Sequence, residues 1–121
     1  MKDIIDHKPD VVILYLGTND APNKTSNAIV DDLLALKNAI EKALPKCKVI
    51  LSSLTPRLDN GKANLTIKHF NDNLKAHKVE VMDNTNITSN DLGKKGLHLS
   101  KGGKAKLARN IVNVLKVDSA N

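Results

Sequence analysis

Two short segments of this chain hold the side chains best suited to chemistry. The first is Gly17-Thr18-Asn19-Asp20, which directly follows the apolar run Val11–Leu16. At such a point the carboxamide of Asn19 can donate a hydrogen bond to a developing oxyanion without carrying a charge. Glycine, asparagine and aspartate are also the favoured residues of simple turns. This segment alone therefore does not separate an oxyanion-binding site from an ordinary turn.

The second segment is the loop 95–103, with the sequence Lys-Gly-Leu-His-Leu-Ser-Lys-Gly-Gly. A histidine on a loop just before a helix is well placed to act as a general base, because its ordinary pKa lies near neutrality. We therefore single out His98. The other histidines, His7, His69 and His77, have no such setting and are interpreted as ordinary surface or satisfied residues.

Three apolar runs predict the strands that position these loops. They are Val11–Leu16, Lys48–Leu54 and Val79–Met82, and polar or turn residues follow each of them. The first run is continuously apolar, as in a strand that is covered on both faces.

Helical periodicity fills the intervals between and after these runs. The first interval carries apolar residues at spacings of four and three, with Thr25 or Ser26 as the cap and Pro45 at the end. Its apolar residues are Ile29, Leu33, Leu36, Ile40 and Leu44. Leu65, Phe70 and Leu74 predict a second, shorter helix. A last helix, begun by Ser100, is predicted by Leu107, Ala108, Ile111 and Leu115.

The alternation of strands and helices predicts an α/β fold in three layers, α/β/α, around a short parallel sheet. In such folds ligands bind beyond the carboxyl ends of the strands. Residues 1–116 form one expected domain, and residues 117–121 an expected flexible tail. No linker or internal repeat divides the chain.

The composition limits the classes of partner. The net charge of +6 and the pI near 9.5 permit non-specific nucleic-acid binding, but one Phe, one Tyr and no Trp leave few platforms on which bases could stack. The longest apolar run is far below the roughly 20 residues of a membrane span. No signal peptide is evident, and Cys47 is alone. We expect an intracellular (cytoplasmic) protein without membrane contact, cofactor or bound metal.

Considered together, the two segments resemble the third and fifth sequence blocks of the SGNH hydrolases, also called GDSL-type esterases and lipases. The resemblance covers about residues 9–116 and rests on GTND and the GLHLSKGG loop. It implies a flavodoxin-like fold in which Asn19 is an oxyanion-hole donor and His98 the base. Gly17, Thr18 and Asp20 would help to bind the substrate. The lysine-rich loop also resembles esterase-like domains of animal non-long-terminal-repeat retrotransposons.

The chain departs from the family pattern at the nucleophile and the acid. It has no Gly-Asp-Ser block and no second glycine block, and the acid expected three residues before the base is Lys95. Asp83 or Asp91 could substitute for that acid. Ser52 and Ser53 are interpreted as strand residues, and Ser100 as a helix cap.

We therefore expect a truncated or degenerate SGNH-like domain of about three strands, covering the C-terminal portion of the family fold, without esterase activity by itself. Two alternatives stay open: an acyl-ester hydrolase completed by another chain or an upstream segment, and a basic nucleic-acid-associated module.

The same comparison predicts assembly. In the SGNH fold the strand matching Val11–Leu16 lies inside the sheet, whereas here it would be an edge. An exposed apolar edge is a template for pairing with another strand. We expect a homodimer in which this strand pairs with its own copy about a two-fold axis.

Overall fold

The computed structural model describes the backbone of residues 6–120 and the side chains of residues 6–116. Its sheet has three parallel strands in the order β1-β2-β3. These are β1 (Val11–Leu14), β2 (Lys48–Ser52) and β3 (Val81–Met82). Val11 is in register with Lys48, and Leu51 with Val81. The predicted α/β class and parallel sheet are confirmed.

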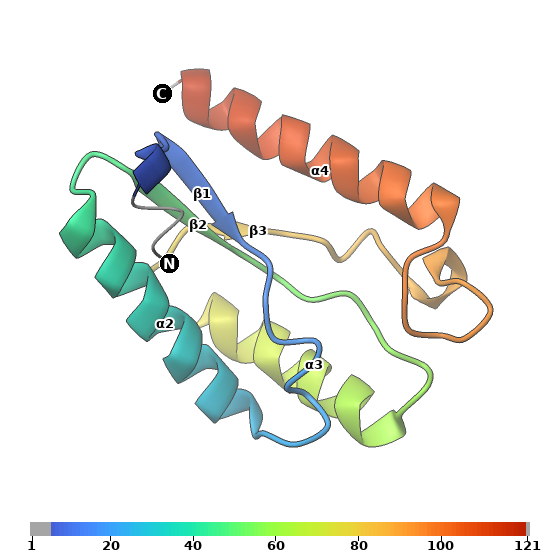
Figure 1. Ribbon diagram of the computed structural model, residues 1–121. Coiled ribbons are helices and arrows are strands. Elements are labelled where there is room, and N and C mark those ends of the chain that lie inside the picture. The colour runs from blue at the N-terminus through green and yellow to red at the C-terminus, as the bar shows by residue number, and fades with distance from the viewer. Residues whose placement is uncertain (1–5, 121) are drawn as a thin grey trace.

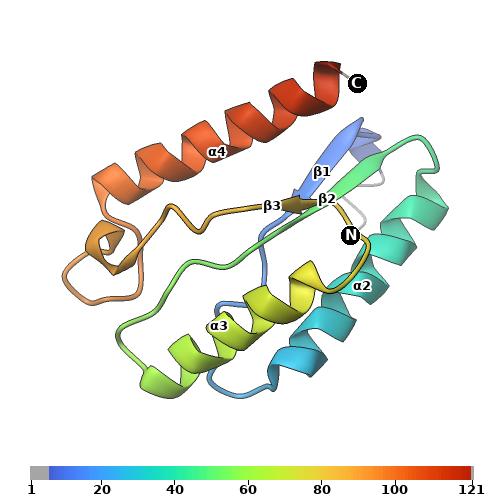
Figure 2. The same cartoon turned by 180° about the vertical axis from the view of Figure 1, so that it is seen from behind.

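The helices lie on both faces of this sheet. Figures 1 and 2 show α2 (Ser26–Ala43) and α3 (Gly61–Lys75) on one face and α4 (Lys101–Ala120) on the other. A single 3-10 turn, η1 (Ser89–Asp91), precedes the loop that leads into α4. The predicted three layers are therefore present. No helix within residues 6–120 is long and apolar enough to span a membrane.

Local capping explains where the first two helices begin. The Thr25 hydroxyl accepts a hydrogen bond from the Ala28 amide at the start of α2, and the Asn60 side chain does the same for the Ala63 amide at the start of α3. The predicted alternative cap, Ser26, is instead the first helical residue. Leu44 is the last residue to bond back to α2, just before Pro45.

One apolar residue of the predicted second helix does not lie on its buried face. Leu65 of α3 is 56% exposed, whereas Ala63, Ile67, Phe70 and Leu74 are buried. Residues that share a helix face are separated by three, four or seven positions. Leu65 is two positions from Ala63, which turns its side chain to the opposite side of the helix.

All three strands are shorter than the apolar runs that predict them, and β3 begins at Val81 instead of Val79. β1 ends at Leu14 instead of Leu16, and β2 ends at Ser52 instead of Leu54. Beyond β2 the backbone of Leu54 bonds to a side chain: its N–H donates to Asn71 Oδ1 at 2.7 Å, and its C=O accepts from Asn71 Nδ2 at 3.0 Å. At Leu54 the chain is thus held by α3, whereas the Ser53 amide still donates to the Met82 carbonyl of β3 at 3.0 Å.

Two surfaces remain open in the described part of the chain. β1 is an edge of the sheet, and its residues Val11, Val12 and Ile13 are only partly buried. Along α4, Val112 is 48% and Leu115 is 37% exposed. The backbone of α4 continues to Ala120, where the sequence predicts a loose tail from residue 117, and Asn121 lies outside the described residues.

Candidate active site

The segment after β1 turns sharply at Gly17. This residue has φ +124°, and a Cβ at this position would come within 2.8 Å of Ile29 Cγ2. Its carbonyl accepts hydrogen bonds from the amides of Asp20 and Ala21, both at 3.1 Å. Glycine is therefore required here by both conformation and space. The turn leaves the Asn19 side chain exposed at the carboxyl end of β1.

Backbone hydrogen bonds within the loop that carries His98 join its two ends. Leu92 and Leu99 form an isolated antiparallel bridge, and the Gly93 amide donates to the His98 carbonyl at 2.7 Å. The Ser100 hydroxyl accepts from the Gly103 amide at 3.2 Å, which is the predicted capping contact at the start of α4. His98 is thereby fixed by its own backbone just before the helix.

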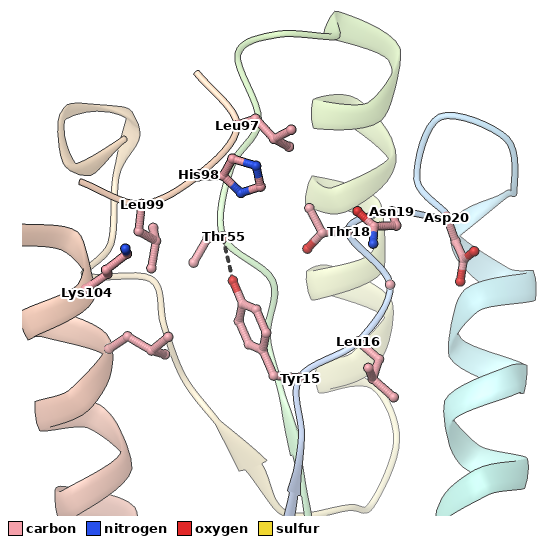
Figure 3. A pocket seen from close by; sticks show the side chains of 12 residues that line it. Tyr15, Leu16, Thr18, Asn19, Asp20, Thr55, Leu97, His98, Leu99 and Lys104 are labelled. Carbon is pink, nitrogen blue, oxygen red and sulfur yellow. Dashed lines mark hydrogen bonds between the residues drawn. The ribbon is translucent and has the colours of Figure 1, made fainter. Parts of the chain in front are cut away.

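Asn19 and His98 line the same pocket, which has a volume of about 820 Å³. Gly17, Thr18 and Asp20 also line it, so all five predicted site residues border one cavity. Figure 3 shows the His98 ring and the Thr18–Asn19 segment arriving from different loops at this end of the sheet. The remaining lining residues are Tyr15, Leu16, Thr55, Leu97, Leu99, Lys104 and Leu107.

Three residues that line this pocket carry hydroxyl groups: Tyr15, Thr18 and Thr55. The Tyr15 hydroxyl and Thr55 Oγ1 share a hydrogen bond at 2.6 Å. Thr18 Oγ1 is buried and has no hydrogen-bond partner among the described residues. A buried hydroxyl without a partner is costly to the fold.

The two carboxylates considered as substitute acids are engaged elsewhere. Asp91 accepts from the Thr88 amide and from Lys106 Nζ, each at 2.9 Å, and these contacts lower its pKa. Asp83 accepts from the Thr85 amide at 2.8 Å, which lowers its pKa too. Neither residue is among those that line the pocket with His98.

The serines considered as nucleophiles have structural partners. Ser52 and Ser53 are buried, where Ser52 Oγ and the Ser53 carbonyl accept from Asn84 Nδ2 and Ser53 Oγ accepts from the Asn84 amide. Ser100 Oγ donates to the Asp91 carbonyl at 2.9 Å. Among the described residues, no serine lines the pocket. Nor do three or more described His, Cys, Asp or Glu side chains gather where they could hold a metal ion.

The sequence prediction missed Arg57, which is 8% exposed. Its Nη1 donates to the Thr18 carbonyl at 2.9 Å, while Nε and Nη2 bond the two carboxylate oxygens of Asp59 at 2.9 and 2.7 Å. The hydrogen bond from Arg57 is the main cause that lowers the pKa of Asp59, and the charge of His98 adds to it. One signal could have revealed this residue: an arginine just past the second predicted strand, at the edge where ligands bind.

The sequence matches the family GDSL-like Lipase/Acylhydrolase over residues 1–111, and the chain therefore belongs to that family. No curated protein matches it.

Solved structures share its fold at low identity. A carbohydrate esterase of family 3 from Talaromyces cellulolyticus superposes with TM-score 0.82 and 22% identity over 98% of this chain. An acetyl esterase mutant solved with an acetate ion gives TM-score 0.81 and 22% identity over 98%. A GDSL-like lipase from Bacteroides thetaiotaomicron gives 0.80 and 19% over 97%, and 67% of that lipase is covered. The chain spans 63% of the length of each of the first two.

Proposed function

We propose that this chain supplies two parts of a GDSL-type esterase site, the oxyanion donor Asn19 and the base His98, and does not hydrolyse esters by itself. The observation that carries this proposal is the position of both residues on one pocket at the carboxyl end of β1. Asn19 would stabilise the negative charge that develops on the ester oxygen, and His98 would accept a proton from a nucleophile.

The lack of activity is inferred from the side chains around His98. A base needs a nucleophile within hydrogen-bond reach and benefits from a carboxylate that fixes its tautomer. Ser52, Ser53 and Ser100 have structural partners, and Lys95 stands where the family has its acid. A degenerate C-terminal portion of the family fold is consistent with these contacts, and its resemblance to retrotransposon-encoded domains suggests a mobile-element origin.

The alternative is a site completed by a segment that brings the serine. This chain spans 63% of the length of the carbohydrate esterase, and β1 is an open edge of the sheet. Both observations favour a further segment that would complete the site. That segment could come from upstream in the same chain or from another chain, and the chimaera described next tests both.

A chimaera tests the roles of Asn19 and His98. A Gly-Asp-Ser strand segment from an active member of the family would be fused ahead of this chain, with Lys95→Asp to restore the acid. We expect hydrolysis of p-nitrophenyl acetate that falls about 10²–10³-fold in Asn19→Ala. It should be lost in His98→Ala.

The matched control is His69→Ala, because His69 is an exposed histidine of α3, outside the residues that line the pocket. It should leave turnover unchanged. Turnover that survives both Asn19→Ala and His98→Ala would refute the assigned roles. Restoration without the Lys95→Asp change would show that the chain already orients its base.

We also propose that the chain forms a homodimer through the edge strand, with β1 of one copy beside β1 of the other. The partly buried apolar residues Val11, Val12 and Ile13 support this, as do the exposed Val112 and Leu115 on α4. Pairing would satisfy the edge of β1 and cover apolar surface that water otherwise contacts.

A further inference from the structure

The segment Arg57–Asp59 contacts three separate parts of the molecule. The Arg57 amide donates to Asn64 Oδ1 at 3.0 Å, which ties the segment to α3. The Arg57 guanidinium bonds the Thr18 carbonyl, next to Asn19. The Leu58 amide donates to the Gly96 carbonyl at 2.6 Å, two residues before His98. One short segment is therefore attached to both loops that carry the proposed catalytic groups.

The chemistry of Arg57 suits a bracing role. A guanidinium is planar and offers its donors in a fixed fork, so three bonds made at once fix its orientation. Asp59 takes two of these bonds and holds the fork in place, while Nη1 holds the Thr18 carbonyl. Lysine has the same charge but only a single flexible ammonium, so it cannot reproduce this geometry.

The Arg57 side chain is also buried. Arg57 is almost completely removed from water although it carries a charge, and buried charges persist where they are paired and hydrogen-bonded. Removal of Asp59 would leave that charge without its carboxylate, and removal of Arg57 would leave the Thr18 carbonyl without its donor. Either change is therefore expected to loosen the turn that presents Asn19.

We propose that Arg57, held by Asp59, is a positioning residue that fixes the Asn19 turn at a set place relative to the His98 loop. This inference rests on the proposed function, in which Asn19 and His98 act on one ester. Arg57 itself is not assigned a contact with substrate.

The test is amide hydrogen exchange and nitrogen NMR on the full 121-residue chain. The variants are Arg57→Lys and Asp59→Asn, and the control is Lys37→Gln, which removes an ion pair to Glu41 on α2. The reporters are the amides of Asp20 and Ala21, which bond the Gly17 carbonyl, and the amide of Leu58. The Asn84 amide, which bonds Ser53 Oγ, is the reference outside the segment.

We expect both variants to speed exchange at Asp20, Ala21 and Leu58 about tenfold or more, as the loss of a charged hydrogen bond allows. Asn84 should exchange as in the parent chain. The Asn19 carboxamide signal and the His98 imidazole signals should shift in Arg57→Lys and Asp59→Asn but not in Lys37→Gln. A merely structural role would instead raise exchange at Asn84 together with the others, because opening would then be global.

Unchanged exchange and unchanged Asn19 and His98 signals in both variants would overturn the inference, as would a uniform rise that includes Asn84. Because these readouts need no turnover, they are separate from the chimaera experiment. Chimaera turnover that survives Asn19→Ala and His98→Ala would contradict the roles of those two residues. The effect of Arg57 on the Asn19 turn could still be measured by exchange.

Discussion

The Asp91 carboxylate accepts a hydrogen bond from Lys106 Nζ at 2.9 Å, which ties the turn before the His98 loop to α4. The same carboxylate accepts from the Thr88 amide in a capping box. Asp91 is therefore part of the scaffold of the loop. It is not bonded to the imidazole of His98, as a substitute acid would be.

These contacts predict how stability depends on pH. The pKa values of Asp59, Asp83 and Asp91 are lowered in the folded chain. Their contribution is present above the unfolded pKa of about 3.9 and is lost as pH falls through the lower folded pKa. We expect the Tm to fall as pH drops below about 4, and Asp91→Asn to lower the Tm at neutral pH and to flatten this fall.

Thermal melts between neutral pH and pH 2 measure this, with Asp31→Asn as the control because Asp31 is an exposed residue of α2. A Tm profile of Asp91→Asn that runs parallel to the parent profile would contradict a stabilising role for the charged carboxylate.

Replacing Asn84 with alanine should destabilise the fold strongly for a single polar residue. Asn84 is 1% exposed, donates to Ser52 Oγ at 2.7 Å and to the Ser53 carbonyl at 3.1 Å, and accepts from Asn110 Nδ2 at 2.8 Å. Asn84→Ala removes all three side-chain bonds at a buried position and should lower the free energy of unfolding by about 1–3 kcal/mol. Urea unfolding measures the change.

Asn90→Ala is the matched control, since the Asn90 side chain is exposed and this change should stay within about 0.5 kcal/mol. Equal losses in the two variants would indicate that the Asn84 network does not stabilise the junction of β2, β3 and α4.

Replacing two glycines with alanine should change the free energy of unfolding in opposite directions. Gly96 has φ +69°, and a Cβ there would lie 2.8 Å from Leu58 Cβ, so Gly96→Ala should cost about 1–3 kcal/mol. Gly61 begins α3 with open space around it, so Gly61→Ala should stabilise by up to about 1 kcal/mol. Urea unfolding of both variants tests this, and a stabilising Gly96→Ala would contradict the strained contact with Leu58.

The proposed dimer predicts a distinct effect of charge on β1. Ile13→Lys places a cation on the pairing edge and should convert the dimer to monomer, with little folded protein recovered. Leu65→Lys changes an equally apolar but exposed residue on α3 and should leave the mass unchanged. Light scattering at micromolar concentration measures both, and a monomeric parent chain would exclude the dimer.

The sequence predicts the elements better than their ends. The periodicity from Ile29 to Leu44 and the capping by Ser100 are visible locally and are confirmed. Just past β2, the Leu54 backbone is held by Asn71, which lies 17 positions away and bonds both of its polar groups. Such a contact requires the tertiary fold, so no local pattern reveals it.

The sequence likewise predicts some residues of the candidate site and not the contacts that hold them. Asn19 and His98 are found from motif and topology, because carboxyl ends of parallel strands gather at one edge. The link from Arg57 to the Thr18 carbonyl joins residues 39 positions apart through a backbone group, which carries no side-chain signature. The partners of Asp91 are equally hidden, since Thr88 contributes its amide and Lys106 lies on the next helix.

The proposal that this chain lacks a nucleophile of its own is tested most directly by a fluorophosphonate serine probe read by intact-protein mass. With the 121-residue chain, we predict no adduct after prolonged incubation, because Ser52, Ser53 and Ser100 are held by structural hydrogen bonds and do not line the pocket with His98. A single adduct on any serine, abolished by His98→Ala, would contradict the proposal and establish a working hydrolase.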